Sequence, residues 1–205
     1  QELVNFSSND YLGLSGDLRI AEAAARAAGR FGWGAGASRL VTGTSILHNE
    51  LEAAVAKFRG TDAALIFGSG YHANLAVISA LVSGGDTVFS DSMNHASIIA
   101  ACRLSGADVR VYKHLGYDEL ERQLSSSTVR GKRLIATDSL FSVEGDCVDC
   151  ARILKLAERY DALIVLDDAH ANGVLGKRGR GVSELQNVSG RMGVVVPHGV
   201  LFRGS

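Results

Sequence analysis

The sequence predicts an α/β protein with a mostly parallel sheet and helices on both faces. From about residue 61, short apolar, β-rich runs alternate with longer amphipathic stretches. Alternation at this spacing is typical of parallel sheets covered on both sides. The composition, 46% hydrophobic and 21% charged over 205 residues, allows one substantial core.

The expected elements follow one another along the chain. Residues 18–30 and 46–58 predict two helices, and the glycine-rich loop at 32–39 separates them. Strands are expected at residues 63–67, 86–90, 108–112, 133–138, 162–167 and 192–196. Helices are expected around residues 71–83, 95–105, 117–126 and 148–160.

Charge and cysteine content exclude several function classes. A net charge of −1 gives no electrostatic reason to expect nucleic acid or an anionic membrane as a partner. No apolar run reaches the roughly 18 residues of a membrane span, and no signal-peptide pattern opens the chain. Three cysteines predict no disulfide framework and a cytoplasmic location. Cys147 and Cys150 form a C-x-x-C without a second pair, so we expect no metal site.

The tetrapeptide Asp167-Asp168-Ala169-His170 directly follows the apolar run at 162–166. Ligands of open α/β sheets bind beyond the carboxyl ends of the strands. The carboxylate suits a protonated ring nitrogen, and the imidazole suits a phenolic oxygen. These are two of the groups that pyridoxal phosphate requires.

Three further segments follow expected strands. Gly68-Ser69-Gly70-Tyr71 opens a helix, where backbone N–H groups and the helix N-terminus favour a phosphate; a tight turn without a ligand is the alternative. His95 is suited to stacking on a flat heteroaromatic ring, or to being a solvent-exposed histidine in a capping cluster. Ser142 offers a hydroxyl at the same edge.

A dinucleotide site is a second hypothesis. Gly68, Gly70 and Ala73 match the G-x-G-x-x-G/A pattern, and Asp91 ends the next strand about twenty residues on, where a ribose-binding acid lies in such proteins. The pattern normally opens its domain, whereas two helices precede it here. It would also leave Asp167 and His170 without a role.

The chain resembles the α-oxoamine synthases, pyridoxal-phosphate enzymes of fold type I. The matching segments lie in family order over about residues 1–186. They are residues 5–14 (NFSSNDYLGL), 34–43 (GAGASRLVTG), 68–74 (GSGYHAN), 91–97 (DSMNHAS), 138–146 (DSLFSVEGD) and 167–181. The residues at 38–41 (SRLV) favour the 8-amino-7-oxononanoate synthases of biotin synthesis over the glycine-using 5-aminolevulinate and aminoketobutyrate types and the sphingoid-base type.

The resemblance implies a reaction and a set of site residues. An amino acid, L-alanine in the biotin branch, is condensed with an acyl-CoA, and carbon dioxide leaves. The implied cofactor residues are Gly70 and Tyr71 at the phosphate, His95 stacked on the ring, Asp167 at the ring nitrogen, and His170 and Ser142 near the ring oxygen. His95, Asp167 and His170 would be catalytic, and Asn9 and His95 would lie near the substrate. The loop at 34–44 would reach a neighbouring subunit, so a homodimer is expected.

The chain departs from this family in two places. The Schiff-base lysine of the family lies about thirty residues beyond the equivalent of His170, whereas no lysine follows Lys177 here. The tail at 190–204 is similar instead to a segment of type I restriction-modification adenine DNA methyltransferases. We therefore expect a partial large domain at 1–187 without its last strands or the small domain, a tail of different origin at 188–205, and no activity from this chain alone.

Overall fold

The structure is a computed structural model that describes residues 3–126, 128–190, 194–196 and 200–203, with side chains described up to residue 190. The chain forms two compact units, residues 1–51 and 52–205. Helix α2 (Ile46–Arg59) begins in the first unit and ends in the second.

The first unit is a small helical segment. It contains the 3-10 turn η1 (Leu14–Gly16) and helix α1 (Leu18–Phe31). The Asp17 side chain accepts a hydrogen bond from the backbone N–H of Arg19 and so caps α1 at its start. Helix α1 ends at Gly32, which has a φ of 79° that an L side chain rarely adopts. No described residue of α1 is buried.

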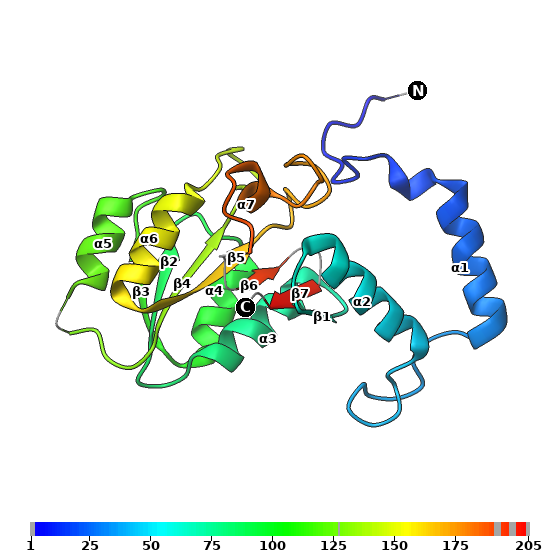
Figure 1. The fold of residues 1–205 in the computed structure, drawn as a ribbon, viewed down its shortest axis with the longest axis horizontal. Coiled ribbons are helices and arrows are strands. Elements are labelled where there is room, and N and C mark those ends of the chain that lie inside the picture. The colour runs from blue at the N-terminus through cyan, green and yellow to red at the C-terminus, as the bar shows by residue number, and fades with distance from the viewer. Residues whose placement is uncertain (1–2, 127, 191–193, 197–199, 204–205) are drawn as a thin grey trace. The chain divides into compact units, whose positions relative to one another are not determined.

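The second unit is built on a seven-stranded sheet (Figure 1). Its strand order is β1-β7-β6-β5-β4-β2-β3. The strands are β1 (Ala63–Ile66), β2 (Thr87–Asp91), β3 (Asp108–Tyr112), β4 (Arg133–Asp138), β5 (Ala162–Asp167), β6 (Val194–Val196) and β7 (Val200–Arg203). Each neighbouring pair along β6-β5-β4-β2-β3 is parallel, and β7 is antiparallel to both β6 and β1.

Helices cover both faces of this sheet, because successive strand residues point to opposite sides. The helices are α3 (Gly70–Leu81), α4 (Ala96–Ser105), α5 (Tyr117–Leu124), α6 (Cys150–Tyr160) and the short α7 (Val182–Leu185). In β2, Val88 packs in the core beneath α3 and α4, whereas its neighbour Phe89 packs in the core beneath α5 and α6. In β5, Val165 packs in the core beneath α3 and α4, and Leu166 packs in the core beneath α5 and α6.

The α/β class, the helices on both faces and the expected strands and helices are confirmed, with shifts of one or two residues at most ends. Residues 192 and 193 of the strand expected at 192–196 lie outside the described residues. Strand β7 was not expected. It lies between β1 and β6, so the sheet continues past Val196. Within the described residues, no helix is long and apolar enough to cross a membrane.

Candidate functional site

Asp167 ends β5 at the carboxyl edge of the sheet, as the sequence predicted. Its side chain is buried, and its two oxygens accept hydrogen bonds from Asn74 Nδ2 at 2.7 Å and from the Ala169 backbone N–H at 3.0 Å. Burial raises the pKa of the Asp167 carboxyl, while the Asn74 hydrogen bond and the nearby His95 and His170 imidazoles act in the opposite direction. A buried carboxylate of this kind favours a cationic ligand group.

His95 is exposed, and its imidazole is near enough to act electrostatically on the Asp167 carboxyl. It caps the start of α4, where its Nδ1 accepts the Ser97 backbone N–H at 3.2 Å. The His95 backbone N–H donates to Asp138 Oδ2 at 2.7 Å. Asp138 ends β4 beside Asp167, and burial together with the Asp167 charge raises the pKa of Asp138 to about 7. Two carboxyl groups and an imidazole therefore meet at one edge.

The turn at Gly68-Ser69-Gly70 connects β1 to α3, as predicted. Ser69 caps the helix by accepting the His72 backbone N–H at 3.2 Å. Gly70 and Tyr71 therefore lie in the first turn, whose backbone N–H groups have no carbonyl partner within a helix and carry partial positive charge. This end of α3 can hold an anionic group.

The remaining predicted site residues are less buried than Asp167. His170 is partly buried, three residues beyond Asp167, and Ser142 lies on the exposed turn after Phe141. Asn9 belongs to the first unit, where its side chain accepts a hydrogen bond from the Tyr11 hydroxyl at 3.3 Å. The contacts of Ser142, His170 and Asn9 with cofactor or substrate stay predictions.

A buried ion pair supports the end of β5. Arg59, at the end of α2, lies 3.0 Å from Asp168 Oδ2, and its guanidinium also donates to the Arg180 carbonyl at 2.5 Å. The other Asp168 oxygen accepts from the Ser139 hydroxyl at 2.5 Å and from the Val182 backbone N–H. Asp168 therefore has a structural role at the end of β5.

The structure argues against the dinucleotide hypothesis. The Asp91 carboxylate is buried and already accepts from the backbone N–H groups of Met93 and Leu115 and interacts with His114 Nδ1 at 3.0 Å. Asp91 instead holds the loop after β3 against the sheet.

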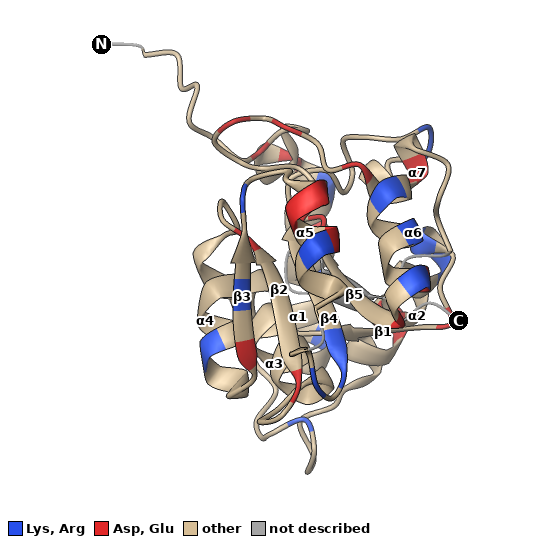
Figure 2. Cartoon of the chain, turned by 90° about the vertical axis from the view of Figure 1, so that its left-hand side faces the viewer, with Lys and Arg blue, Asp and Glu red and all other residues tan. Residues whose placement is uncertain are grey.

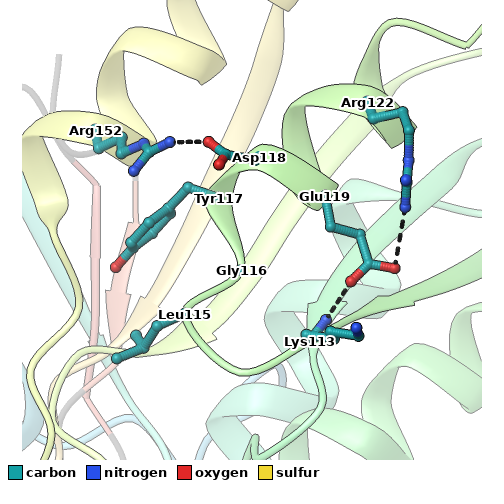
Figure 3. Close-up of a pocket in the computed structure, with 8 residues that line it drawn as sticks. All are labelled: Lys113, Leu115, Gly116, Tyr117, Asp118, Glu119, Arg122 and Arg152. Atoms are coloured by element: carbon teal, nitrogen blue, oxygen red, sulfur yellow. Dashed lines mark hydrogen bonds and ion pairs between the residues drawn. The ribbon is translucent and has the colours of Figure 1, made fainter.

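The possible metal ligands, the cysteine pair and the cavity of the second unit give weaker evidence for a functional site. Among the described residues no cluster of three or more metal-ligating side chains occurs, and Cys147 and Cys150 are free thiols whose pKa burial raises. A cavity of about 340 Å³ lies at the loop between β3 and α5 (Figure 3). Four of its charged side chains form ion pairs, Arg152 with Asp118 and Arg122 with Glu119, and none of the predicted site residues lines it.

The chemistry of these groups fits pyridoxal phosphate. They are a buried carboxylate at Asp167, the backbone N–H groups at the start of α3, and the imidazole of His95. An amine is the missing group. All five lysines of the sequence are exposed, as are the basic residues along α6 that appear as blue bands in Figure 2. The lysines are Lys57, Lys113, Lys132, Lys155 and Lys177.

Several residues at this edge were not singled out from the sequence. Asn74 and Ser97 lie inside the quoted segments 68–74 and 91–97, and Asp138 opens the segment 138–146. A polar residue that interrupts the apolar face of a helix is the only local signal for Asn74. Arg59 carries no local signal at all, because its partner Asp168 is far away in the sequence.

Comparison with known proteins gives a consistent result. The aminotransferase class I and II family matches residues 1–199. The chain is 48% identical over 184 residues to a putative 8-amino-7-oxononanoate synthase 2 of Bacillus velezensis, covering 90% of this chain and 48% of the relative. It is 46% identical over 197 residues to the 8-amino-7-oxononanoate synthase of Thermoanaerobacter pseudethanolicus, covering 96% and 50%. The chain thus spans about half the length of these curated relatives.

Solved structures agree. The chain superposes with a TM-score of 0.92 and 29% identity on a lysine-to-alanine variant of serine palmitoyltransferase from S. paucimobilis with a bound PLP–myriocin aldimine, covering 97% of this chain and 52% of that one. For 8-amino-7-oxononanoate synthase from Francisella tularensis the TM-score is 0.84 at 28% identity, covering 100% and 59%. The chain belongs to the aminotransferase class I and II family, and within it to the α-oxoamine synthases.

Proposed function

We propose that this chain is the cofactor-binding portion of a pyridoxal-phosphate acyltransferase. The reaction would join an amino acid, L-alanine, to an acyl-CoA with loss of carbon dioxide, as in biotin synthesis. The observation that carries the proposal is the buried Asp167 at the carboxyl edge, with His95 beside it and the start of α3 nearby in the chain's own fold. The relatives named 8-amino-7-oxononanoate synthase support the alanine-using branch. A glycine-using relative is the alternative.

Each residue has a role that its own chemistry supports. Asp167 pairs with the ring nitrogen and keeps it protonated, so that the cofactor, once bound, can withdraw electrons from the substrate. Gly70 and Tyr71 would hold the phosphate through backbone N–H groups, and His95 would cover the ring face and contact the substrate. The family resemblance alone implies the roles of Ser142 and His170 near the ring oxygen and of Asn9 near the substrate.

The missing lysine limits what this chain does by itself. Without an amine near the site, the cofactor binds non-covalently and no base is placed for the substrate α-proton. The serine palmitoyltransferase variant that lacks one lysine and still holds a PLP aldimine supports retention of the cofactor by such a fold. We propose that condensation requires a lysine that this sequence does not supply.

A titration with pyridoxal phosphate, followed by absorbance and equilibrium dialysis, tests this function. We expect reversible binding that sodium borohydride does not fix to the chain. Asp167→Ala should weaken binding at least about tenfold, since it removes a charge-assisted hydrogen bond. Asp62→Ala, which removes an exposed carboxylate of the same unit, serves as the matched control.

Three outcomes contradict the proposal. They are an absence of binding, equal binding by the Asp167→Ala variant, and a cofactor fixed covalently by borohydride. A parallel fluorescence titration with NADH should show no binding, since Asp91 is already engaged.

A further inference from the structure

Two buried polar side chains, Asn74 of α3 and Ser97 of α4, lie between Asp167 and His95. Their residues are 0% and 1% exposed. Neither has a role in the proposed function above. Buried polar side chains that bond to one another specify a single arrangement, so the direction of each hydrogen bond can be worked out.

The contacts of Asn74 with Asp167 and Ser97 give the direction of the first two hydrogen bonds. Asn74 Nδ2 lies 2.7 Å from Asp167 Oδ2 and 2.9 Å from Ser97 Oγ. The amide NH2 group donates to both atoms, which suits an ionised Asp167 because a carboxylate only accepts hydrogen bonds. One N–H then goes to Asp167 and the other to Ser97. The Ser97 hydroxyl oxygen is therefore an acceptor from Asn74.

The direction follows independently from the His95 end. The Ser97 backbone N–H lies 3.2 Å from His95 Nδ1 and can only donate, so this ring nitrogen carries no proton. The Ser97 hydroxyl lies 2.6 Å from the same nitrogen. Its single hydrogen must then point to His95 Nδ1. The two ends agree, because Ser97 accepts from Asn74 and donates to His95.

We propose that Asn74 and Ser97 are positioning residues that link the Asp167 carboxylate to the His95 imidazole and hold His95 in the tautomer with its proton on Nε2. Nε2 lies on the opposite side of the ring from this network. It therefore acts as a hydrogen-bond donor for an oxygen of a bound substrate. This use of the donor rests on the proposed function, whereas the tautomer itself does not.

The charge of Asp167 also affects His95 through this network. An ionised Asp167, which any bound cationic group favours, keeps the Asn74 amide turned with its NH2 toward the acid. A neutral Asp167 would donate a hydrogen and allow the amide to turn, which would remove the donor to Ser97. The charge state of Asp167 and the orientation of the Ser97 hydroxyl are thus coupled, and the effect ends at the His95 ring.

Long-range proton–nitrogen NMR spectra of histidine-labelled protein, recorded without cofactor, test the proposal. In the wild type we expect His95 Nε2 protonated and Nδ1 unprotonated, with the signal assigned by its loss in His95→Gln. Ser97→Ala should lower the ratio of the Nε2–H to the Nδ1–H tautomer about fivefold, the effect of one net hydrogen bond. Asn74→Leu should lower this ratio too, because it frees the Ser97 hydroxyl to accept a hydrogen bond from the Nδ1–H tautomer. Ser97→Thr should restore the wild-type ratio.

Ser105→Ala is the matched control, because Ser105 lies on the same helix and its hydroxyl donates to the Cys102 carbonyl at 2.7 Å, outside the network. Circular dichroism establishes that each variant is folded, and if Asn74→Leu is not, the Ser97 variants alone decide. A proton on Nδ1 in the wild type, or an unchanged ratio in folded Ser97→Ala, overturns the proposal. Since no cofactor is present, a failure of pyridoxal phosphate to bind would leave this result standing.

Discussion

Asp138 lies between the site edge and the sheet interior, and its ionisation should affect stability. Burial and the Asp167 charge raise the pKa of Asp138 to about 7, well above the ordinary value of 3.8. Between pH 4 and 7 the folded state therefore binds more protons than the unfolded state. The contribution of this group to the free energy of unfolding must fall as the pH rises through that window.

Asp138→Asn removes this dependence while keeping a side-chain oxygen for the His95 backbone N–H. We expect the variant to exceed the wild type in free energy of unfolding by about 1–3 kcal/mol at pH 8, and by much less at pH 4. Urea unfolding at both pH values measures the difference. Asp62→Asn should show no such change, and an equal difference at the two pH values would contradict the pKa shift.

Single residues also show where prediction from sequence stops. Asp167 and His95 were predicted as site residues because each follows an apolar strand, and side chains at parallel strand ends gather at one edge. Asn74 was not, because its role depends on Asp167, which lies 93 residues away. Local patterns show that a polar side chain interrupts an apolar face, but they do not show which distant group it meets.

At the level of elements, strands and helices follow closely from apolar periodicity, and β5 was predicted residue for residue. Strand β7 was not expected, because the tail at 190–204 was assigned to a different origin and its partner β1 lies near the other end of the unit. The connection between α2 and β5 was also not predictable. It depends on the buried contact of Arg59 with Asp168, and no local pattern marks either residue as the partner of the other.

Arg59→Leu tests this connection. The substitution leaves Asp168 buried without its cation, which costs about 3–5 kcal/mol in comparable buried pairs. Arg159→Leu is the matched control, because its ion pair with Glu121 is solvent-exposed and such pairs contribute about 0–1 kcal/mol. Chemical unfolding of both variants gives the comparison. Similar losses in the two variants would show that the Arg59 pair does not hold α2 to the end of β5.

For the whole molecule, the two units differ in how much they bury. The second unit has two cores, one on each face of the sheet. In the first unit the large apolar side chains are exposed, with Phe6 and Trp33 each 92% and Leu40 97% exposed. The homodimer that the family resemblance implies for the loop at 34–44 stays a prediction.

Trp33 allows a direct test of that homodimer, since it is the only tryptophan in the sequence. If a second copy covers the first unit, the Trp33 emission should shift to shorter wavelength as the protein concentration rises, in step with the mass from light scattering. Leu40→Ser should weaken this association, because it places a hydroxyl at an apolar contact. Leu104→Ser, at a 64% exposed position on α4 in the second unit, should leave it unchanged. A monomer mass and a constant emission at every concentration would contradict the dimer and leave the apolar surface of the first unit to a different partner.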